Sequence, residues 1–144
     1  MKNTVNVSAR PGMKELDRMV GTWKISGGAS GTVTYEWMDD GYFLMQRSAM
    51  DFQDRVMKSL DIIGYVKGFG AAESEPNITS RSYSDGGYIT DYTYELKGDT
   101  LIIWRGTIGS STFSKSTFSE DGNTLTGAWE WPGGGYQFVM TRMS

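Results

Sequence analysis

Apolar and polar residues alternate along most of the chain with a period of two residues. Val33, Tyr35 and Trp37, for example, alternate with two threonines and a glutamate. Successive side chains of a strand point to opposite faces of a sheet, so this alternation predicts strands with one buried face. About ten such segments follow one another at intervals of roughly 8–12 residues, with turns rich in Gly, Asp and Asn between them, which favours a β-sandwich or a β-barrel.

One segment near the N-terminus has a helical period instead. Its apolar residues share one face of a helix: Met13, Leu16, Met19 and Val20. We therefore expect a helix of about two turns over these residues, ended by Gly21. Residues 1–10 are polar and are expected to form a loose arm.

The succession of strands and short turns predicts an all-β protein, a single antiparallel up-and-down barrel of about ten strands. The 144 residues are enough for one domain, spanning 1–144, and too few for two. Such a barrel can hold one small ligand, and we expect the short N-terminal helix at its closed end. The least regular connection, residues 67–76, is either a flap over the open end or a plain surface loop.

The composition excludes several classes of chemistry. The chain has no Cys and no His, which removes disulfides, thiolate nucleophiles, the commonest general base and the usual ligand of zinc and haem. We therefore expect no cofactor and no metal. The net charge of −3 disfavours nucleic acid as a partner. Neither an apolar signal region nor an apolar run near the roughly 20 residues that span a bilayer is visible, so we expect no membrane association and a cytoplasmic location.

Several short motifs follow one another in a recognisable order. They are Gly21-Thr22-Trp23, Tyr35-Glu36-Trp37 before Asp40-Gly41-Tyr42-Phe43, Ile63-Gly64-Tyr65, and the hairpin of residues 121–127. In this order they resemble a bacterial lipocalin-like (calycin-like) barrel family, a domain of unknown function. The resemblance covers the chain from Met13 onward. It implies a closed barrel, and it assigns neither an activity nor a catalytic residue.

The resemblance also implies a structural pair. In calycins the Trp of the first strand packs at the closed end against an Arg near the end of the last strand, and Trp23 and Arg142 occupy those places here. The guanidinium face can stack on the indole while its N–H groups bind carbonyls at the barrel base. The neighbouring haem-binding nitrobindin-like barrels also begin with Gly-x-Trp, but they need an axial His, which this chain lacks.

Alternate residues of a strand share one face of the sheet, and we call residues at such alternate positions residues of the same parity. By this parity, most of the aromatic residues lie on the inward face of the barrel. They form either a solid core or the lining of a cavity, and Tyr favours a cavity because a phenol packs as an apolar body yet offers a hydroxyl. The candidate ligand-contacting residues are Tyr35, Trp37, Arg47, Tyr65, Tyr92, Tyr94, Trp104, Arg105, Trp129 and Phe138.

Two of these candidates, Arg47 and Arg105, carry a positive charge. Each shares its strand parity with apolar residues, as Arg47 does with Met45 and Arg105 with Ile103. An Arg inside the barrel requires an anionic partner, which is either a ligand carboxylate or a lumenal Asp or Glu. The alternative is that each Arg points to solvent from the outer face.

Asp61 is the one candidate for a catalytic residue. It shares parity with Ile63 and Tyr65, whereas Glu36, Glu95 and Glu130 lie on the polar parity and are expected to be exposed. A desolvated carboxyl with a raised pKa can act as a general base.

Three functions remain open from the sequence. The first is binding of a small, largely apolar or amphipathic molecule in the lumen, with an acidic group met by Arg47 or Arg105. The second is a barrel enzyme of isomerase or cyclase type that transfers a proton through Asp61 or a Tyr. The third is a structural or interaction domain with a filled barrel. A deep cavity separates the first two from the third. The protein is expected to be a monomer or a homodimer.

Overall fold

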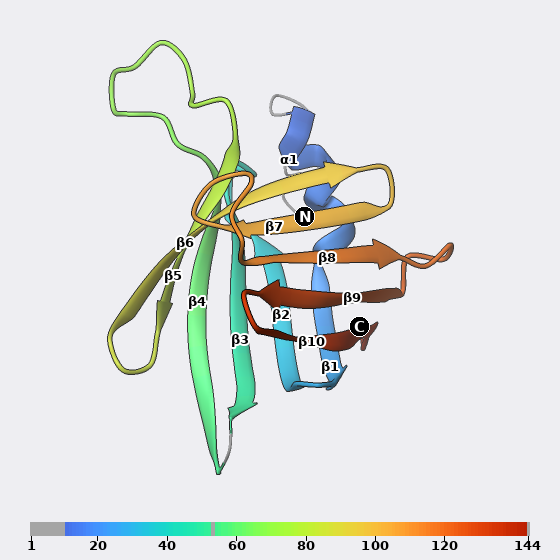
Figure 1. The fold of residues 1–144 in the computed structure, drawn as a ribbon. Coiled ribbons are helices and arrows are strands. Elements are labelled where there is room, and N and C mark those ends of the chain that lie inside the picture. Colours follow the sequence, from blue (N-terminus) through green and yellow to red (C-terminus); the bar gives the residue numbers. More distant parts are fainter. Residues whose placement is uncertain (1–10, 53, 144) are drawn as a thin grey trace.

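The computed structural model describes residues 11–52 and 54–143, so the expected arm of residues 1–10 lies outside the described part. Ten strands form one closed antiparallel barrel in which each strand pairs with its neighbours in sequence (Figure 1). They are β1 (Gly21–Gly27), β2 (Ser30–Trp37), β3 (Leu44–Phe52), β4 (Arg55–Tyr65), β5 (Ile78–Ser84), β6 (Tyr88–Lys97), β7 (Thr100–Arg105), β8 (Phe113–Phe118), β9 (Thr124–Trp131) and β10 (Gly134–Arg142). The predicted up-and-down barrel is therefore confirmed.

The barrel closes where the first and last strands pair. β1 and β10 lie antiparallel over five residue pairs, from Trp23 opposite Arg142 to Gly27 opposite Phe138. Among the described residues, each of the ten strands pairs with a neighbour on both sides, so the sheet lacks the free edge strands that would otherwise template pairing with another chain. It also makes the inward faces of all ten strands one enclosed surface.

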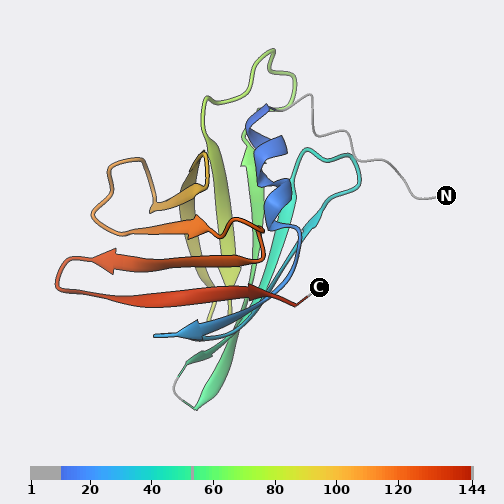
Figure 2. The same ribbon diagram turned by 90° about the vertical axis from the view of Figure 1, so that its right-hand side faces the viewer.

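A short helical segment covers the end of the barrel at which β1 begins. It consists of α1 (Pro11–Glu15) and the 3-10 turn η1 (Leu16–Met19), which matches the predicted two turns. Figure 2 shows this segment at one end of the barrel. Met13, Leu16 and Met19 are almost fully buried, so the apolar stripe of the segment packs against the barrel. The Trp23 indole N–H donates a hydrogen bond of 2.8 Å to the Met19 carbonyl, which ties this segment to β1.

Trp23 and Arg142 pack together at this covered end. The Arg142 guanidinium lies 4.2 Å from the centroid of the fully buried Trp23 ring. It donates hydrogen bonds to the carbonyls of Val20, Arg18 and Gly122. One cation thereby joins the start of β1, the helical segment and the β8–β9 turn.

The loop between β4 and β5 lies at the covered end too. Strand direction alternates around the barrel, so β4 ends on the side where the helical segment sits, as Figure 1 shows. The alternative of a flap over the open end is therefore wrong for residues 67–76. Phe69 in this loop is fully exposed.

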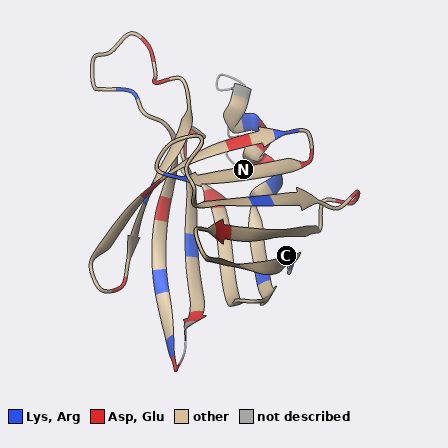
Figure 3. Cartoon of the chain, in the orientation of Figure 1, with Lys and Arg blue, Asp and Glu red and all other residues tan. Residues whose placement is uncertain are grey.

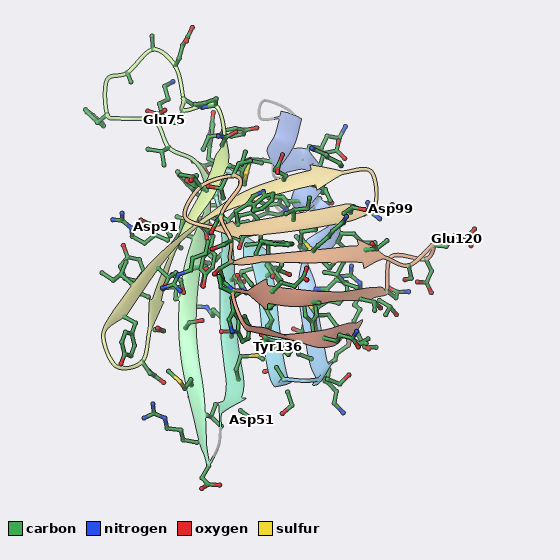
Figure 4. The ribbon with its side chains drawn as sticks, in the orientation of Figure 1. Asp51, Glu75, Asp91, Asp99, Glu120 and Tyr136 are labelled. Atoms are coloured by element: carbon green, nitrogen blue, oxygen red, sulfur yellow. The ribbon has the colours of Figure 1, made fainter. Side chains whose placement is uncertain are left out.

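Charged residues of both signs are dispersed over the outer surface and the turns (Figure 3). Arg81 pairs with Asp91 at 2.8 Å, and Arg18 pairs with Asp99 at 2.9 Å. The carboxylates labelled in Figure 4 lie at the periphery of the barrel, whereas the labelled Tyr136 lies within its outline. Within residues 11–52 and 54–143, no helix is long and apolar enough to cross a membrane.

We expect Arg142→Ala to lower the free energy of unfolding by about 2–4 kcal/mol, because it removes a cation–π contact and leaves three carbonyls without their donor. Urea unfolding followed by Trp fluorescence measures this change. The matched control is Arg81→Ala, which breaks an exposed ion pair and should lower the free energy of unfolding far less than Arg142→Ala does. Equal losses in the two variants would contradict the role given to Arg142.

Candidate functional site

The barrel encloses a cavity of about 530 Å³. Its lining includes Arg105, Thr112 and Trp131, at strand ends opposite the helical segment, so the cavity opens at that end. A second hollow of about 100 Å³ shares Ile25, Val33 and Trp129 with the first and reaches Met19. The lumen is thus a blind tube with its deep end beneath the helical segment.

The lumen has two chemically different walls. Six polar side chains line it from the contiguous strands β3 to β6, and we call them the polar wall: Gln46, Ser48, Ser59, Asp61, Ser82 and Thr90. The arc from β7 through β10 to β1 and β2 supplies mainly apolar and aromatic side chains, and we call these the apolar wall: Ile25, Val33, Ile103, Trp129, Trp131 and Tyr136. Met50, Tyr92, Tyr94, Arg105 and Thr112 complete the lining.

Asp61 is the most unusual member of the polar wall. It is only 5% exposed, and the Ser80 hydroxyl donates a hydrogen bond of 3.4 Å to its Oδ2. Burial raises the pKa of Asp61, while hydrogen bonds from Ser82 and Ser80 act against that rise. No Lys or Arg of the described residues forms an ion pair with Asp61. Its carboxyl group is therefore desolvated and held only by neutral donors.

The same environment shifts the pKa values of three tyrosines in the lumen. Burial raises the pKa of Tyr35, Tyr92 and Tyr94, and the negative charge of Asp61 raises each of them further. These phenols therefore stay protonated at neutral pH and can donate hydrogen bonds. The Tyr92 ring on β6 also stands edge to face with Trp129 on β9, with centroids 6.0 Å apart.

Arg105 supplies the positive charge of the cavity lining. It is the last residue of β7 and stands opposite Tyr92 in the register, and its charge lowers the pKa of that phenol against the effect of burial. Among the described residues, no carboxylate lies within ion-pair distance of its guanidinium. Its donors therefore remain available to a ligand.

The structure brings seven of the sequence candidates into the lumen. They are Tyr35, Asp61, Tyr92, Tyr94, Arg105, Trp129 and Phe138. Four candidates lie elsewhere: Trp37, Arg47, Tyr65 and Trp104.

Arg47 and Trp104 point outward because the inward parity of their strands falls on their neighbours. Gln46 and Ser48 line the cavity on either side of Arg47, which instead lies 3.9 Å from Glu36 on the outer face. Trp104 donates a hydrogen bond of 2.6 Å to Glu95 outside the barrel. These interactions explain why neither side chain faces the lumen.

Trp37 and Tyr65 have the inward parity, but they lie at the end covered by the helical segment. The Trp37 indole donates a hydrogen bond of 2.8 Å to Asp17 of η1. The Tyr65 hydroxyl occupies the space where a Cβ at Gly12 would stand, which holds α1 close to β4. Both residues therefore anchor the helical segment rather than line the cavity.

The sequence candidates missed most of the polar wall. Gln46 and the serines of β3, β4 and β5 are small or uncharged, so they resemble ordinary exposed strand residues when read singly. The available signal was their parity, since Ser59 and Asp61 alternate in step with buried Ile63, and Gln46 with buried Leu44. Ser80 and Ser82 also have the parity of a buried face.

No protein-family model matches the chain, and no curated protein matches it. The structure therefore supports a ten-strand antiparallel β-barrel without assigning it to a family. Over residues 11–52 and 54–143 there is also no group of three or more Asp or Glu side chains placed to hold a metal ion.

We expect Asp61→Asn to raise the free energy of unfolding at pH 7 by about 1–3 kcal/mol, because it removes a buried charge that no cation compensates. The folded-state pKa of Asp61 lies above its usual value of 3.8. Proton uptake therefore stabilises the fold fully below that value, and this stabilisation is lost as the pH rises through the folded-state pKa. The gain in Asp61→Asn should shrink as the pH falls toward 4.

Denaturant unfolding of the parent protein and of Asp61→Asn at several pH values measures how the difference in unfolding free energy depends on pH. The control is Asp91→Asn on the outer face, where Arg81 lowers the pKa of the carboxyl, so no gain is expected at neutral pH. A loss of stability in Asp61→Asn that is the same at every pH would contradict the prediction that the buried Asp61 carboxylate destabilises the fold.

Proposed function

We propose that the protein binds a small, largely apolar molecule carrying an acidic group inside the barrel lumen. The observation that carries this proposal is the cavity of about 530 Å³ with its aromatic lining. Cavities of about 300–1,000 Å³ with apolar walls and a few placed polar groups are typical of small-molecule sites. This space favours binding over the alternative of a filled barrel.

Arg105 is the residue that would meet the acidic group. It lines the cavity near its open end, and no carboxylate of the described residues neutralises it. A guanidinium binds a carboxylate through two parallel hydrogen bonds, so it would fix the orientation of an amphipathic molecule. The apolar part of the ligand would then extend toward Trp129 and the deep hollow beneath the helical segment.

We also propose a lipocalin-like identity and a cytoplasmic location. The identity is supported by the closed up-and-down barrel and by the stacking of Arg142 on Trp23 at the covered end. The location rests on the absence of Cys, which fits a reducing compartment.

A barrel enzyme is the second candidate, and the position of Asp61 favours it. A buried carboxyl that faces a ligand cavity and has a raised pKa is suited to accept and return a proton. The test is to incubate the protein with whatever molecule it retains and to follow conversion by mass spectrometry. Conversion that disappears in Asp61→Asn would support catalysis, whereas an unchanged molecule would leave binding as the function.

Native mass spectrometry of the freshly purified protein is the first experiment on binding, with extraction of any retained molecule. Decanoate and 1-anilinonaphthalene-8-sulfonate then serve as acidic apolar probes. Their binding is monitored through the fluorescence of Trp129 and the other Trp residues. We expect both probes to bind, and Arg105→Gln to weaken them about tenfold through the loss of a charge-assisted hydrogen bond.

Arg47→Gln is the matched control, because Arg47 has the same charge but lies on the outer face beside Glu36. It should leave both affinities within about twofold of the parent protein. Equal weakening in the two variants would show that the acid is not held in the lumen. A clean apo mass together with no response to either probe would refute the binding function.

A further inference from the structure

Six polar side chains of the lumen are gathered on one side of it. Arg105 and Thr112 near the open end, and Ser114 and Ser116 in the deeper hollow, lie instead on β7, on β8 or between them. All six side chains of the polar wall come from β3 to β6, which are contiguous in the barrel. The strands that follow carry the indoles of Trp129 and Trp131 and the phenol of Tyr136. A ligand in this lumen therefore has a polar surface along one side and aromatic faces along the other.

The polar wall is continuous from strand to strand. Gln46 stands opposite Asp61, Asp61 opposite Ser82, and Ser82 opposite Thr90 in the pairing register. Side chains directly opposite each other on neighbouring strands lie about 4.5–5.5 Å apart at Cβ, close enough for one ligand to reach several of them. Ser48 and Ser59 form the adjoining pair, and their hydroxyls share a hydrogen bond.

A plain acyl chain is a poor match for this wall. Methylene groups against Asp61, Gln46 and the serines would displace water without replacing its hydrogen bonds, at a cost of about 1–3 kcal/mol for each group left unpaired. An ionised carboxylate only accepts hydrogen bonds, so Asp61 calls for donors on the ligand. Hydroxyl groups supply such donors, and the hydroxyls of Ser82 and Thr90 can donate to them or accept from them.

The apolar wall specifies the shape of the same ligand. Within this wall, Tyr136 stands edge to face with Trp131, with centroids 6.0 Å apart. Two adjoining rings extend the aromatic surface: Tyr92 stands edge to face with Trp129 at 6.0 Å, and Phe138 with Tyr136 at 6.5 Å. Aromatic side chains arranged in this way present faces and edges to a flat ring system. A saturated chain would gain less from them, because it offers no ring to stack.

We propose that the lumen selects flat, hydroxylated aromatic molecules whose hydroxyl groups donate hydrogen bonds to Asp61. This deepens the proposed binding function and rests on it, but it does not depend on Arg105 or on the acidic group of the ligand.

Isothermal titration calorimetry with the full chain tests the proposal. The probes are 3′,4′-dihydroxyflavone and flavone, which are neutral and differ only in two hydroxyls, and decanoate as an acyl chain. We expect the dihydroxyflavone to bind about tenfold to a hundredfold more tightly than flavone, as a hydrogen bond to a charged group predicts. Asp61→Leu should reduce this preference to less than about threefold.

Two further variants keep the test decisive. Asp61→Asn retains the shape of the side chain if Asp61→Leu does not fold, and it should reduce the preference as well because it removes the charge. Asp91→Asn is the matched control, since this carboxylate lies 55% exposed on the outer face beside Arg81, and the preference should persist in it.

Each remaining outcome counts against the proposal in a distinguishable way. Flavone or decanoate binding as tightly as the dihydroxyflavone, or a preference that survives both Asp61 variants, would overturn the selection while the binding function stands. A failure of all three probes, together with 1-anilinonaphthalene-8-sulfonate, would overturn the binding function too.

Discussion

The pairing of β1 with β10 is the constraint on which the rest of the structure depends. A lumen exists only if the inward faces of all ten strands enclose it, and the register that opposes Trp23 to Arg142 closes that surface. Arg142 secures the closure at the covered end, because it stacks on the Trp23 indole and binds carbonyls of Val20, Arg18 and Gly122. The helical segment is held by the same residues, since the indole N–H donates to Met19. One pair thus determines both the closed sheet and the blind end of the cavity.

The deep end of the barrel is lined mainly by apolar side chains, which leave only a hollow of about 100 Å³ there. Nearer the open end, the polar wall departs from that pattern. Asp61 is buried with only serine hydroxyls as partners, so we expect it to lower the stability of the fold at neutral pH relative to a Leu or an Asn at the same position. Natural sequences commonly retain such a destabilising group where function needs it. The position of Asp61 on a cavity wall is consistent with that relation between stability and function.

The fold was predictable from the sequence because each strand carries the period of two, and turns of Gly, Asp and Asn separate the strands. The inward face of each strand was harder to predict, because apolar residues of β3 and β7 occur on both faces. On the outer face, Phe43, which directly precedes β3, fills the space over Gly64, and Trp104 of β7 packs against Phe113 with ring centroids 5.2 Å apart. Apolar neighbours of matching parity therefore left both faces open for Arg47 and Arg105. The structure places Arg47 beside Glu36 on the outer face and Arg105 in the cavity lining.

Parity also leaves the depth of a side chain undetermined. Trp37 and Tyr65 share their parity with lumenal Tyr35 and Asp61, yet they lie two to four residues nearer the covered end, where Asp17 and Gly12 of the helical segment engage them. Their position depends on long-range contacts with a segment that no strand pattern describes.

Small polar residues of the lumen are hard to identify for a different reason, since Gln46 or Ser82 alone resembles an exposed strand residue. They can be recognised as part of the cavity lining only when the register places them beside Asp61 on neighbouring strands. The ligand-facing surface is thus a property of strand pairing, and pairing is what a single sequence specifies least directly.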